Sequence, residues 1–459
     1  MRCSITRTPR LFRAALLGLA LSLGAPLSSA HAEDAAKPDA AAPDFWSRET
    51  LTGDWAGLRP MFAVHGFTFA FNHIGETLGT VRGDRRLWIY GGRLEMTFEA
   101  DLEKAFGWPG ATFHVTGYQI HGRGLSADAL GNVLAASGIE AAPSTRLFTL
   151  WLEQAWAEKR ISLRIGQLAA DDEFAISPAA ATFVNGTFGW PGILAANLTS
   201  GGPAYPLAAP GARLRVEPFE NFSVQAAIFS GDPAGTGGEP DPQRRNRGGT
   251  RFSFAGGAFA IAEAALTSGE SGWIAGLPGT VKAGFWYHSG AFDDQRYDGA
   301  GLSLADPASS GAARRHRGNY GGYVVLDQTL WRIGGSKERG LDAFLRFGVN
   351  PSDRNLVGWY ADAGLVLKGA LEARPADAIG LAFGFARISG AARGLDRDAL
   401  LFGGTAPVRN QEAVLELTYV AQIAPWWSVQ PDFQYVFHPG ASTAVRDAAI
   451  FGVRTSLKF

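Results

Sequence analysis

The sequence contains a single cysteine, Cys3, and no long hydrophobic run after its first 32 residues. Without further cysteines, the rest of the chain can form no disulfide, no thiolate metal site and no cysteine nucleophile. Without a run of roughly 20 apolar residues, it has no segment that could anchor it in a bilayer as a helix. These absences exclude a disulfide-stabilised secreted domain and a helical membrane protein.

The first 32 residues have the pattern of an export signal. Four arginines precede the apolar stretch 14–27, and Ala30-His31-Ala32 matches a small-residue cleavage site. We expect residues 1–32 to be a signal peptide and residues 33–65 to form a periplasmic leader with a short helix around 54–65. Removing the four arginines leaves 38 basic residues against 43 acidic ones, so we expect no nucleic-acid partner.

The histidines of the mature chain are too scattered to indicate an enzyme. None lies in an HExxH motif, and the sequence has no GxSxG motif to place a serine nucleophile. We therefore expect no catalytic residue, no bound metal and no cofactor. The enzyme alternative is an outer-membrane hydrolase, which phospholipid hydrolysis in detergent would reveal. A gated receptor would need a plug domain, for which the stretch before the first predicted strand is too short.

What the sequence has in abundance is glycine, with 59 residues, and phenylalanine, with 30. This composition fits a large all-β chain with many turns. From Gly66 onward, segments that alternate between apolar and polar residues recur, as in strands that have one apolar face. We predict sixteen strands, at 66–78, 89–102, 111–120, 147–157, 160–168, 211–217, 222–229, 257–266, 280–288, 320–331, 341–349, 357–369, 378–387, 411–423, 427–437 and 449–459.

The last predicted strand alternates up to the final residue, Phe459. Phe451 and Leu457 fall on one face, with Arg454 and Lys458 on the other. An apolar face opposite a charged face suits a strand that lies between lipid and a watery lumen. From this segment alone, a half-buried strand of a soluble sheet is an equal alternative.

The connections between the predicted strands favour the membrane alternative. Odd-numbered connections are mostly long and even-numbered ones mostly short, as expected for the outer loops and periplasmic turns of a transmembrane barrel. A soluble sandwich has no reason to show this parity. We therefore predict an all-β fold, a transmembrane antiparallel β-barrel of about 16 strands over residues 66–459, with both termini on the periplasmic side.

Residues 169–210 form the longest connection, and we expect this third outer loop to fold inward. A sixteen-stranded barrel otherwise encloses a wide channel. Acidic groups of the loop would face basic and amide groups of the flanking strands, and aromatic rings would offer flat faces to a sugar. The predicted substrate constriction comprises Asp171, Asp172, Glu173, Arg164, Gln167, Arg213, Arg215, Trp190, Phe188, Arg93 and Glu95. The alternative is a solvated acidic loop whose neighbouring arginines pair with each other or with lipopolysaccharide.

Two arginine-rich stretches, 244–247 and 314–317, lie in the predicted fourth and fifth outer loops. We expect them either to bind phosphates of lipopolysaccharide or to be solvated loop charges, with equal weight on the two interpretations.

Several long stretches of the chain resemble the carbohydrate-selective porin family of Gram-negative outer membranes. The resemblance implies a sixteen-stranded barrel that passes monosaccharides and related small polar solutes by diffusion through a charged constriction. It also implies that the insertion machinery of the outer membrane recognises Phe459, and that the protein contacts lipid and lipopolysaccharide and assembles as a homotrimer. A general diffusion porin without sugar preference is the alternative. The stretches are LTGDWAGLRPMFAVHGFTF (51–69), GWPGATFHVTGYQIHGRGLS (107–126), STRLFTLWLEQAW (144–156), LRIGQLAADDEFAIS (163–177), FVNGTFGWP (183–191) and SGGPAYPLAAPGARLR (200–215).

Overall fold

The computed structural model describes residues 44–269, 272–274 and 276–459. The predicted signal peptide, 1–32, and the first part of the predicted leader, 33–43, lie outside the described residues. Residues 44–459 form one compact unit. No helix in the described part of the chain is long and apolar enough to cross a membrane.

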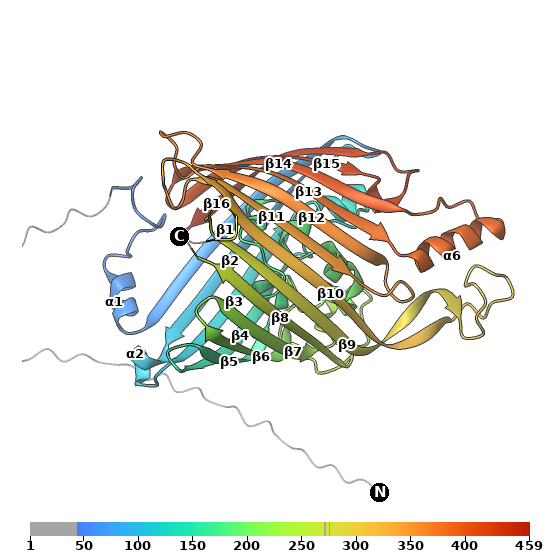
Figure 1. The fold of residues 1–459 in the computed structure, drawn as a ribbon, viewed down its shortest axis with the longest axis horizontal. Coiled ribbons are helices and arrows are strands. Elements are labelled where there is room, and N and C mark those ends of the chain that lie inside the picture. The colour runs from blue at the N-terminus through green and yellow to red at the C-terminus, as the bar shows by residue number, and fades with distance from the viewer. Residues whose placement is uncertain (1–43, 270–271, 275) are drawn as a thin grey trace, which may run out of the picture. The chain divides into compact units, whose positions relative to one another are not determined.

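Sixteen strands form a closed antiparallel barrel (Figure 1). Each strand pairs with its neighbours in sequence, and β1 pairs with β16 to close the ring. Every predicted segment coincides with one strand, apart from the positions of its ends, so the predicted fold class is confirmed. The strands are β1 (Phe67–Arg82), β2 (Trp88–Asp101), β3 (Ala111–Gly122), β4 (Ser144–Trp156), β5 (Ile161–Leu168), β6 (Ala209–Phe219), β7 (Phe222–Ser230), β8 (Ala258–Ser268), β9 (Gly279–Asp298), β10 (Ala313–Arg332), β11 (Gly340–Val349), β12 (Val357–Lys368), β13 (Ala378–Ile388), β14 (Gln411–Ala424), β15 (Trp427–Phe437) and β16 (Ala448–Lys458).

The alternation in the sequence separates an outward from an inward face on these strands. In β16, Phe451 and Val453 are 46% and 40% exposed, whereas Ile450, on the other face, is completely buried. Arg454 shares the inward face and donates a hydrogen bond of 2.6 Å to Glu76 of β1. Exposed apolar side chains outside and paired charges inside are the pattern of a barrel surrounded by lipid.

The segment before β1 packs against the end of the barrel that holds the C-terminus. It contains α1 (Leu58–Val64), within the stretch where a short helix was expected. The Leu51 N–H donates to the Lys458 carbonyl at 2.7 Å, and Arg59 donates to the Phe459 carbonyl. The first and last parts of the described chain therefore meet at one rim.

Short helices lie in the connections between strands. Asp101 caps α2 by accepting the N–H groups of Glu103 and Lys104, and the positive φ of Gly107 ends this helix. α2 lies at the barrel end that carries the C-terminus, and α6 lies at the opposite end (Figure 1). The helices are α2 (Leu102–Phe106), α3 (Gly186–Gly189), α4 (Gly192–Asn197), α5 (Pro242–Arg245) and α6 (Gly390–Leu401), with single turns at 126–130, 170–172, 180–182, 199–201 and 439–441.

The hairpin of β9 and β10 is longer than predicted, with 20 residues in each strand. The arginine-rich stretch 314–317 therefore lies within β10 rather than in a loop, and that placement was wrong. Arg315 pairs with Asp293 of β9 at 2.8 Å. The sequence conceals this extension because the pairing of the two strands is irregular on both sides of the arginine-rich stretch, which interrupts the alternation.

Candidate functional site

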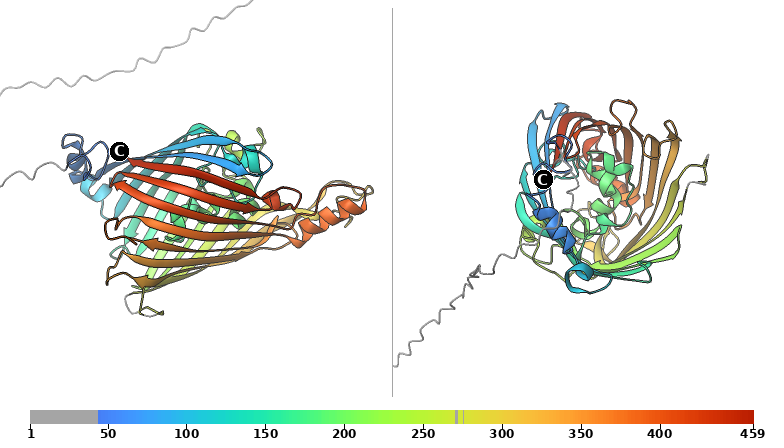
Figure 2. Two further views of the ribbon diagram at one scale, coloured as in Figure 1. Left: turned by 90° about the horizontal axis from the view of Figure 1, so that it is seen from above. Right: turned by 90° about the vertical axis from the view of Figure 1, so that its left-hand side faces the viewer.

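The connection between β5 and β6, residues 169–208, is hydrogen-bonded to strands from the far part of the barrel. In the view along the barrel, its helical turns lie within the ring of strands (Figure 2). The N–H groups of Val184 and Asn185 donate to Glu416 of β14 at 2.6 and 2.9 Å. The Asn197 side chain exchanges two hydrogen bonds with the backbone of Val357 in β12. Buried side chains thus hold this segment, the 169–208 segment, at several points.

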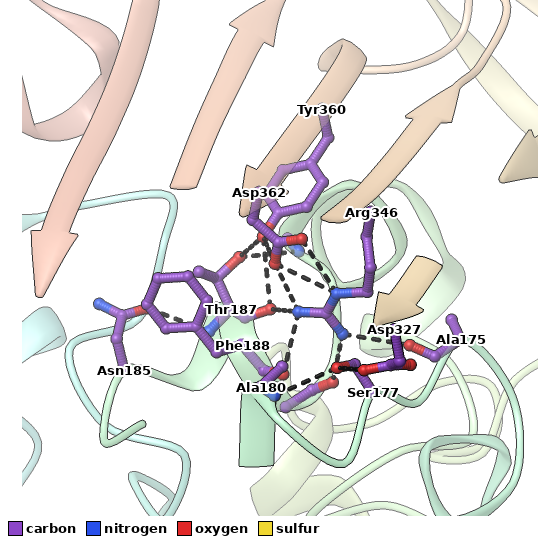
Figure 3. Close-up of polar contacts among 12 residues, drawn as sticks. Ala175, Ser177, Ala180, Asn185, Thr187, Phe188, Asp327, Arg346, Tyr360 and Asp362 are labelled. Carbon is purple, nitrogen blue, oxygen red and sulfur yellow. Dashed lines mark hydrogen bonds and ion pairs between the residues drawn. The ribbon is translucent and has the colours of Figure 1, made fainter. Parts of the chain in front are cut away.

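Arg346 of β11 makes the densest of these attachments (Figure 3). Its guanidinium is paired with Asp362 of β12, with Nε and Oδ1 3.0 Å apart. The Tyr360 hydroxyl donates to Asp362 at 2.7 Å and lies 2.8 Å from the Thr187 hydroxyl. The remaining guanidinium N–H groups donate to four carbonyls of the segment, those of Thr187, Phe188, Ala175 and Gly189, at 2.9 to 3.1 Å.

Four charged side chains form a closed network at the start of the segment. Arg164 of β5 contacts Glu153 and Glu173 at 3.1 and 2.8 Å. Arg213 of β6 contacts the same two acids at 2.6 and 2.7 Å. Each arginine therefore faces both carboxylates, which makes the network electrically neutral while leaving a strongly polar wall. The Arg164 guanidinium also lies 3.7 Å from the ring centroid of Trp151.

This network lines a polar cavity on the side of the short turns, which we call the turn-side cavity. Its lining includes Ser162, Lys159, Arg215 and Glu217 besides the four charged residues. Arg215 pairs with Glu217 at 2.7 Å. Of the predicted constriction residues, the structure brings together Arg164, Arg213, Arg215, Asp172 and Glu173 around this cavity.

A second cavity lies on the side of the long loops, and we call it the loop-side cavity. Arg93 of β2 lies between the rings of Tyr118 and Tyr205, 4.7 and 5.1 Å from their centroids, and contacts Glu95 at 3.3 Å. Trp190 contributes its ring to the same cavity and donates its indole N–H to a backbone carbonyl. These predicted residues therefore share one polar and aromatic pocket.

Asp172 lines both cavities. Its side chain is exposed, and no hydrogen bond or ion pair to it occurs among the residues that the structure describes. The neighbouring Asp171 differs, because its carboxylate accepts the Tyr205 N–H at 2.8 Å. Burial raises the pKa of Asp171 to about 6. The two adjacent aspartates thus differ in their contacts: Asp171 accepts a backbone hydrogen bond, and Asp172 accepts none from the described residues. The pKa of Asp172 is also raised well above its usual range, because the surrounding protein displaces water and Asp171 and Glu173 lie close by.

Two predicted site residues do not have the expected surroundings. Phe188 is only 1% exposed and packs between Phe183 and Phe344, at centroid distances of 5.0 and 6.1 Å. Phe188 also lines the loop-side cavity, but its low exposure leaves little of the ring for a sugar to contact. Trp190, two residues further on, remains partly accessible. The sequence alone did not show that the two aromatic residues differ in exposure.

Gln167 is the second correction, because it lies on the outward face. Positions 164 and 167 differ by an odd number, so alternation places them on opposite sides of β5. The Gln167 amide donates to the carbonyls of Phe148 and Gly249 at 2.7 and 2.9 Å. It lines an apolar groove with Ile165 and Phe252 on the outside of the barrel.

The buried polar residues that attach the 169–208 segment were not predicted from the sequence. These are Arg346, Tyr360, Asp362, Glu416 and Gln434, which are all buried on the inward face. The sequence does contain a signal for them, which is a charged residue in the middle of a predicted strand. Burying such a charge costs free energy unless it has a partner. The sequence does not reveal that this partner is a loop from the opposite part of the barrel.

Comparison with known proteins agrees with this architecture. The family model described as "Carbohydrate-selective porin, OprB family" matches residues 85–459. The chain belongs to this family. Porin B of Pseudomonas aeruginosa is similar to it, at 27% identity over 473 aligned residues that cover 96% of this chain and 95% of porin B.

Solved structures of OprB from Pseudomonas putida have the same fold. The high-pH structure matches with a TM-score of 0.83 at 25% identity, covering 91% of this chain and all of the OprB chain. The low-pH structure matches with a TM-score of 0.55 at 20% identity, covering 90% of this chain and 99% of that one. This member of the OprB family is therefore a carbohydrate-selective porin, a channel of the outer membrane, as the sequence resemblance implied.

Proposed function

We propose that monosaccharides and related small polar solutes cross this porin by a narrow passage beside Asp172. The loop-side and turn-side cavities share Asp172, and it is their only common lining residue within the described residues. A solute that moves from one cavity to the other would pass this carboxylate. That shared residue is the observation that carries the proposal.

The chemistry of both cavities suits an uncharged, polyhydroxylated solute. In the loop-side cavity, Arg93 and Glu95 present a donor and an acceptor, and the partly accessible Trp190 lines the same cavity. In the turn-side cavity the charges of Arg164 and Glu173 are already paired. A sugar hydroxyl would exchange hydrogen bonds with water for bonds to these groups at little net gain, so binding stays weak enough for release.

Liposome swelling tests the sugar preference. We expect glucose to enter liposomes that contain the porin faster than a polyethylene glycol of the same hydrodynamic radius, because only the sugar can use the paired donors and acceptors. Equal rates for the two solutes would indicate a general diffusion porin. No swelling with either solute would overturn the assignment of an open passage.

We further propose that Phe459 serves as the recognition signal for outer-membrane insertion and that the porin assembles as a homotrimer. Phe459 continues the outward series of Phe451 and Leu457 to the chain end. Deleting Phe459 should lower the amount of folded barrel in the outer membrane, whereas Lys458→Gln should not.

The trimer has its own test. Chemical cross-linking in native membranes should yield a product of three chains, and a cross-linked series that stops at one chain would contradict the trimer.

A further inference from the structure

Three arginines lie at the end of the barrel opposite the C-terminus (Figure 1). Arg387 is near the end of β13, and Arg393 and Arg397 follow it on α6. Residues four apart on a helix share one face, so Arg393 and Arg397 are neighbours. Arg387 is three residues before the first residue of α6. Burial and the charges of Arg387 and Arg397 lower the pKa of Arg393, in agreement with these positions. We call these three residues the α6 arginine cluster.

Both aspartates of α6 are hydrogen-bonded to arginines outside this cluster. Asp396 is bound by Arg409 through two hydrogen bonds of 2.9 and 3.0 Å to its side chain. Asp398 is bound by Arg296 in the same way, at 2.7 and 2.8 Å. Both carboxylates of the helix are thus engaged by arginines from other segments.

No arginine of the cluster makes an ion pair or a hydrogen bond with an acid among the residues that the structure describes, although the charge of Arg397 contributes to the lowered pKa of Asp398. Arg387 donates to the neutral side chain of Gln411 at 2.5 Å. The Nε of Arg393 is buried and has no hydrogen-bond acceptor. Arg397 is exposed and makes no ion pair within the described residues. Three positive charges held together without an ion-paired acid favour an anionic ligand that the protein does not itself provide.

The position of Arg387 shows where this ligand would lie. On the outward face of β13, Phe383 is 43% exposed, and Arg387 lies further along the same face. Arg387 is the register partner of Trp359, whose ring stacks on Phe385 with centroids 4.9 Å apart. Phe347 extends this row on β11, 6.2 Å from Trp359. Such a row of outward aromatics marks the boundary between lipid and water, so Arg387 lies at the level of the lipid headgroups, and α6 begins three residues after it.

We propose that the α6 arginine cluster binds the phosphate groups of lipopolysaccharide in the outer leaflet. Guanidinium groups bind phosphate oxygens through paired hydrogen bonds, and basic residues next to a membrane-spanning segment attract anionic headgroups. The proposal rests on the outer-membrane location of the barrel and is independent of the passage at Asp172. It also assigns a role to α6, which contributes to neither cavity.

Other arginines at the barrel surface provide matched controls. Arg123 pairs with Asp128 at 2.7 Å, and Arg446 pairs with Asp84 at 3.7 Å. Both are exposed, so replacing them changes the total charge by the same amount as replacing two arginines of the cluster. They differ from the cluster in having an acidic partner already.

The test is binding of purified, detergent-solubilised porin to three probes: lipopolysaccharide, the same lipopolysaccharide without its lipid A phosphates, and inorganic phosphate. We expect Arg393→Gln/Arg397→Gln to weaken binding of phosphorylated lipopolysaccharide about tenfold or more, since each basic group near the headgroups adds favourable energy. Arg123→Gln/Arg446→Gln should change the affinity much less. Unchanged single-channel conductance would confirm that each variant barrel is folded.

Three outcomes would overturn the proposal. One is equal affinity of the cluster variant, the control variant and the unmodified porin for phosphorylated lipopolysaccharide. Another is binding that persists undiminished after the lipid phosphates are removed. The third is tight binding of inorganic phosphate that the cluster variant loses, which would make the cluster a site for a soluble anion instead of a lipid.

Discussion

Arg346 and Asp362 are direct cross-strand partners on β11 and β12, and they form a completely buried ion pair beneath the 169–208 segment. An ion pair in such a position stabilises a structure only when its remaining hydrogen-bonding groups are also satisfied. Here the carbonyls of the segment and the Tyr360 hydroxyl satisfy them. The pair therefore attaches the segment to the barrel wall, and we expect its removal to change the conductance of the pore.

Replacing Arg346 by methionine should detach part of the segment. The substitution leaves the Asp362 carboxylate buried without its cation, which costs about 3–5 kcal/mol. We expect the barrel to unfold at a lower temperature on heat-modifiability gels and its single-channel conductance to become larger and noisier.

Arg346→Lys is the informative companion variant. Lysine keeps the charge but lacks the planar fork that reaches several carbonyls at once. We expect the unfolding temperature and the single-channel conductance of Arg346→Lys to lie between those of the unmodified porin and those of Arg346→Met. If Arg346→Met changed neither unfolding temperature nor conductance, the ion pair would not be what holds the segment.

Removing one acid from the four-residue network should change ion selectivity. In Glu173→Gln, Arg164 and Arg213 share the single carboxylate of Glu153, so the turn-side cavity gains positive charge. The reversal potential in a KCl gradient should shift toward anion preference. Glu217→Gln, which removes the same charge at the Arg215 pair, is the control and should shift it less. A larger shift of the reversal potential in Glu217→Gln than in Glu173→Gln would mean that the narrowest part of the passage is not at the four-residue network.

Burial of Glu140 predicts a pH dependence in the loop that precedes β4. Its carboxylate accepts the N–H groups of Leu125 and Ser126, and burial raises the pKa of Glu140 from 4.5 to about 7. A raised carboxyl pKa means that folding favours the protonated form, so its contribution is complete below pH 4.5 and lost as the pH rises through 7.

Hydrogen exchange measures this effect. After correction for intrinsic rates, the amides of Leu125 and Ser126 should be better protected at pH 5 than at pH 8. In Glu140→Gln the difference between the two pH values should disappear. Equal protection at both pH values in the unmodified porin would contradict the prediction.

Trp190 should contribute to sugar affinity without contributing much to ion flow. Loss of a stacked aromatic face costs about 1 kcal/mol, or roughly a fivefold weaker block of the ion current by glucose, in Trp190→Ala. Trp190→Phe keeps a flat apolar face and should retain most of the block. Identical block in the alanine and phenylalanine variants would show that the ring does not touch the sugar.

The strands were predictable because alternation is a local property of the sequence. Phe451 and Arg454, for example, are assigned to opposite faces by position alone, and the structure agrees. The same rule places Gln167 on the opposite face of β5 from Arg164, so the prediction that both face the lumen did not follow the alternation. The length of β9 and β10 was not predictable, because irregular pairing near Arg315 breaks the alternation.

The candidate site was only partly predictable, because its contacts join residues far apart in the sequence. The acids and arginines near the segment were identifiable by type, but which of them pair with each other depends on the register of three strands. The attachments through Arg346 and Glu416 depend on where the segment lies across the barrel, which no local pattern records. Burial likewise separates Phe188 from Trp190 only once the segment is folded.

A cysteine at position 172 tests the central claim most directly, since the chain from Glu33 onward contains no other cysteine. In planar bilayers, a charged methanethiosulfonate reagent should reduce the current through Asp172→Cys channels in discrete steps and weaken sugar passage. Channels with Arg244→Cys, whose exposed side chain lies outside both cavities, should be labelled without loss of current. Complete labelling of position 172, verified by mass, with the current unchanged would contradict a passage beside Asp172.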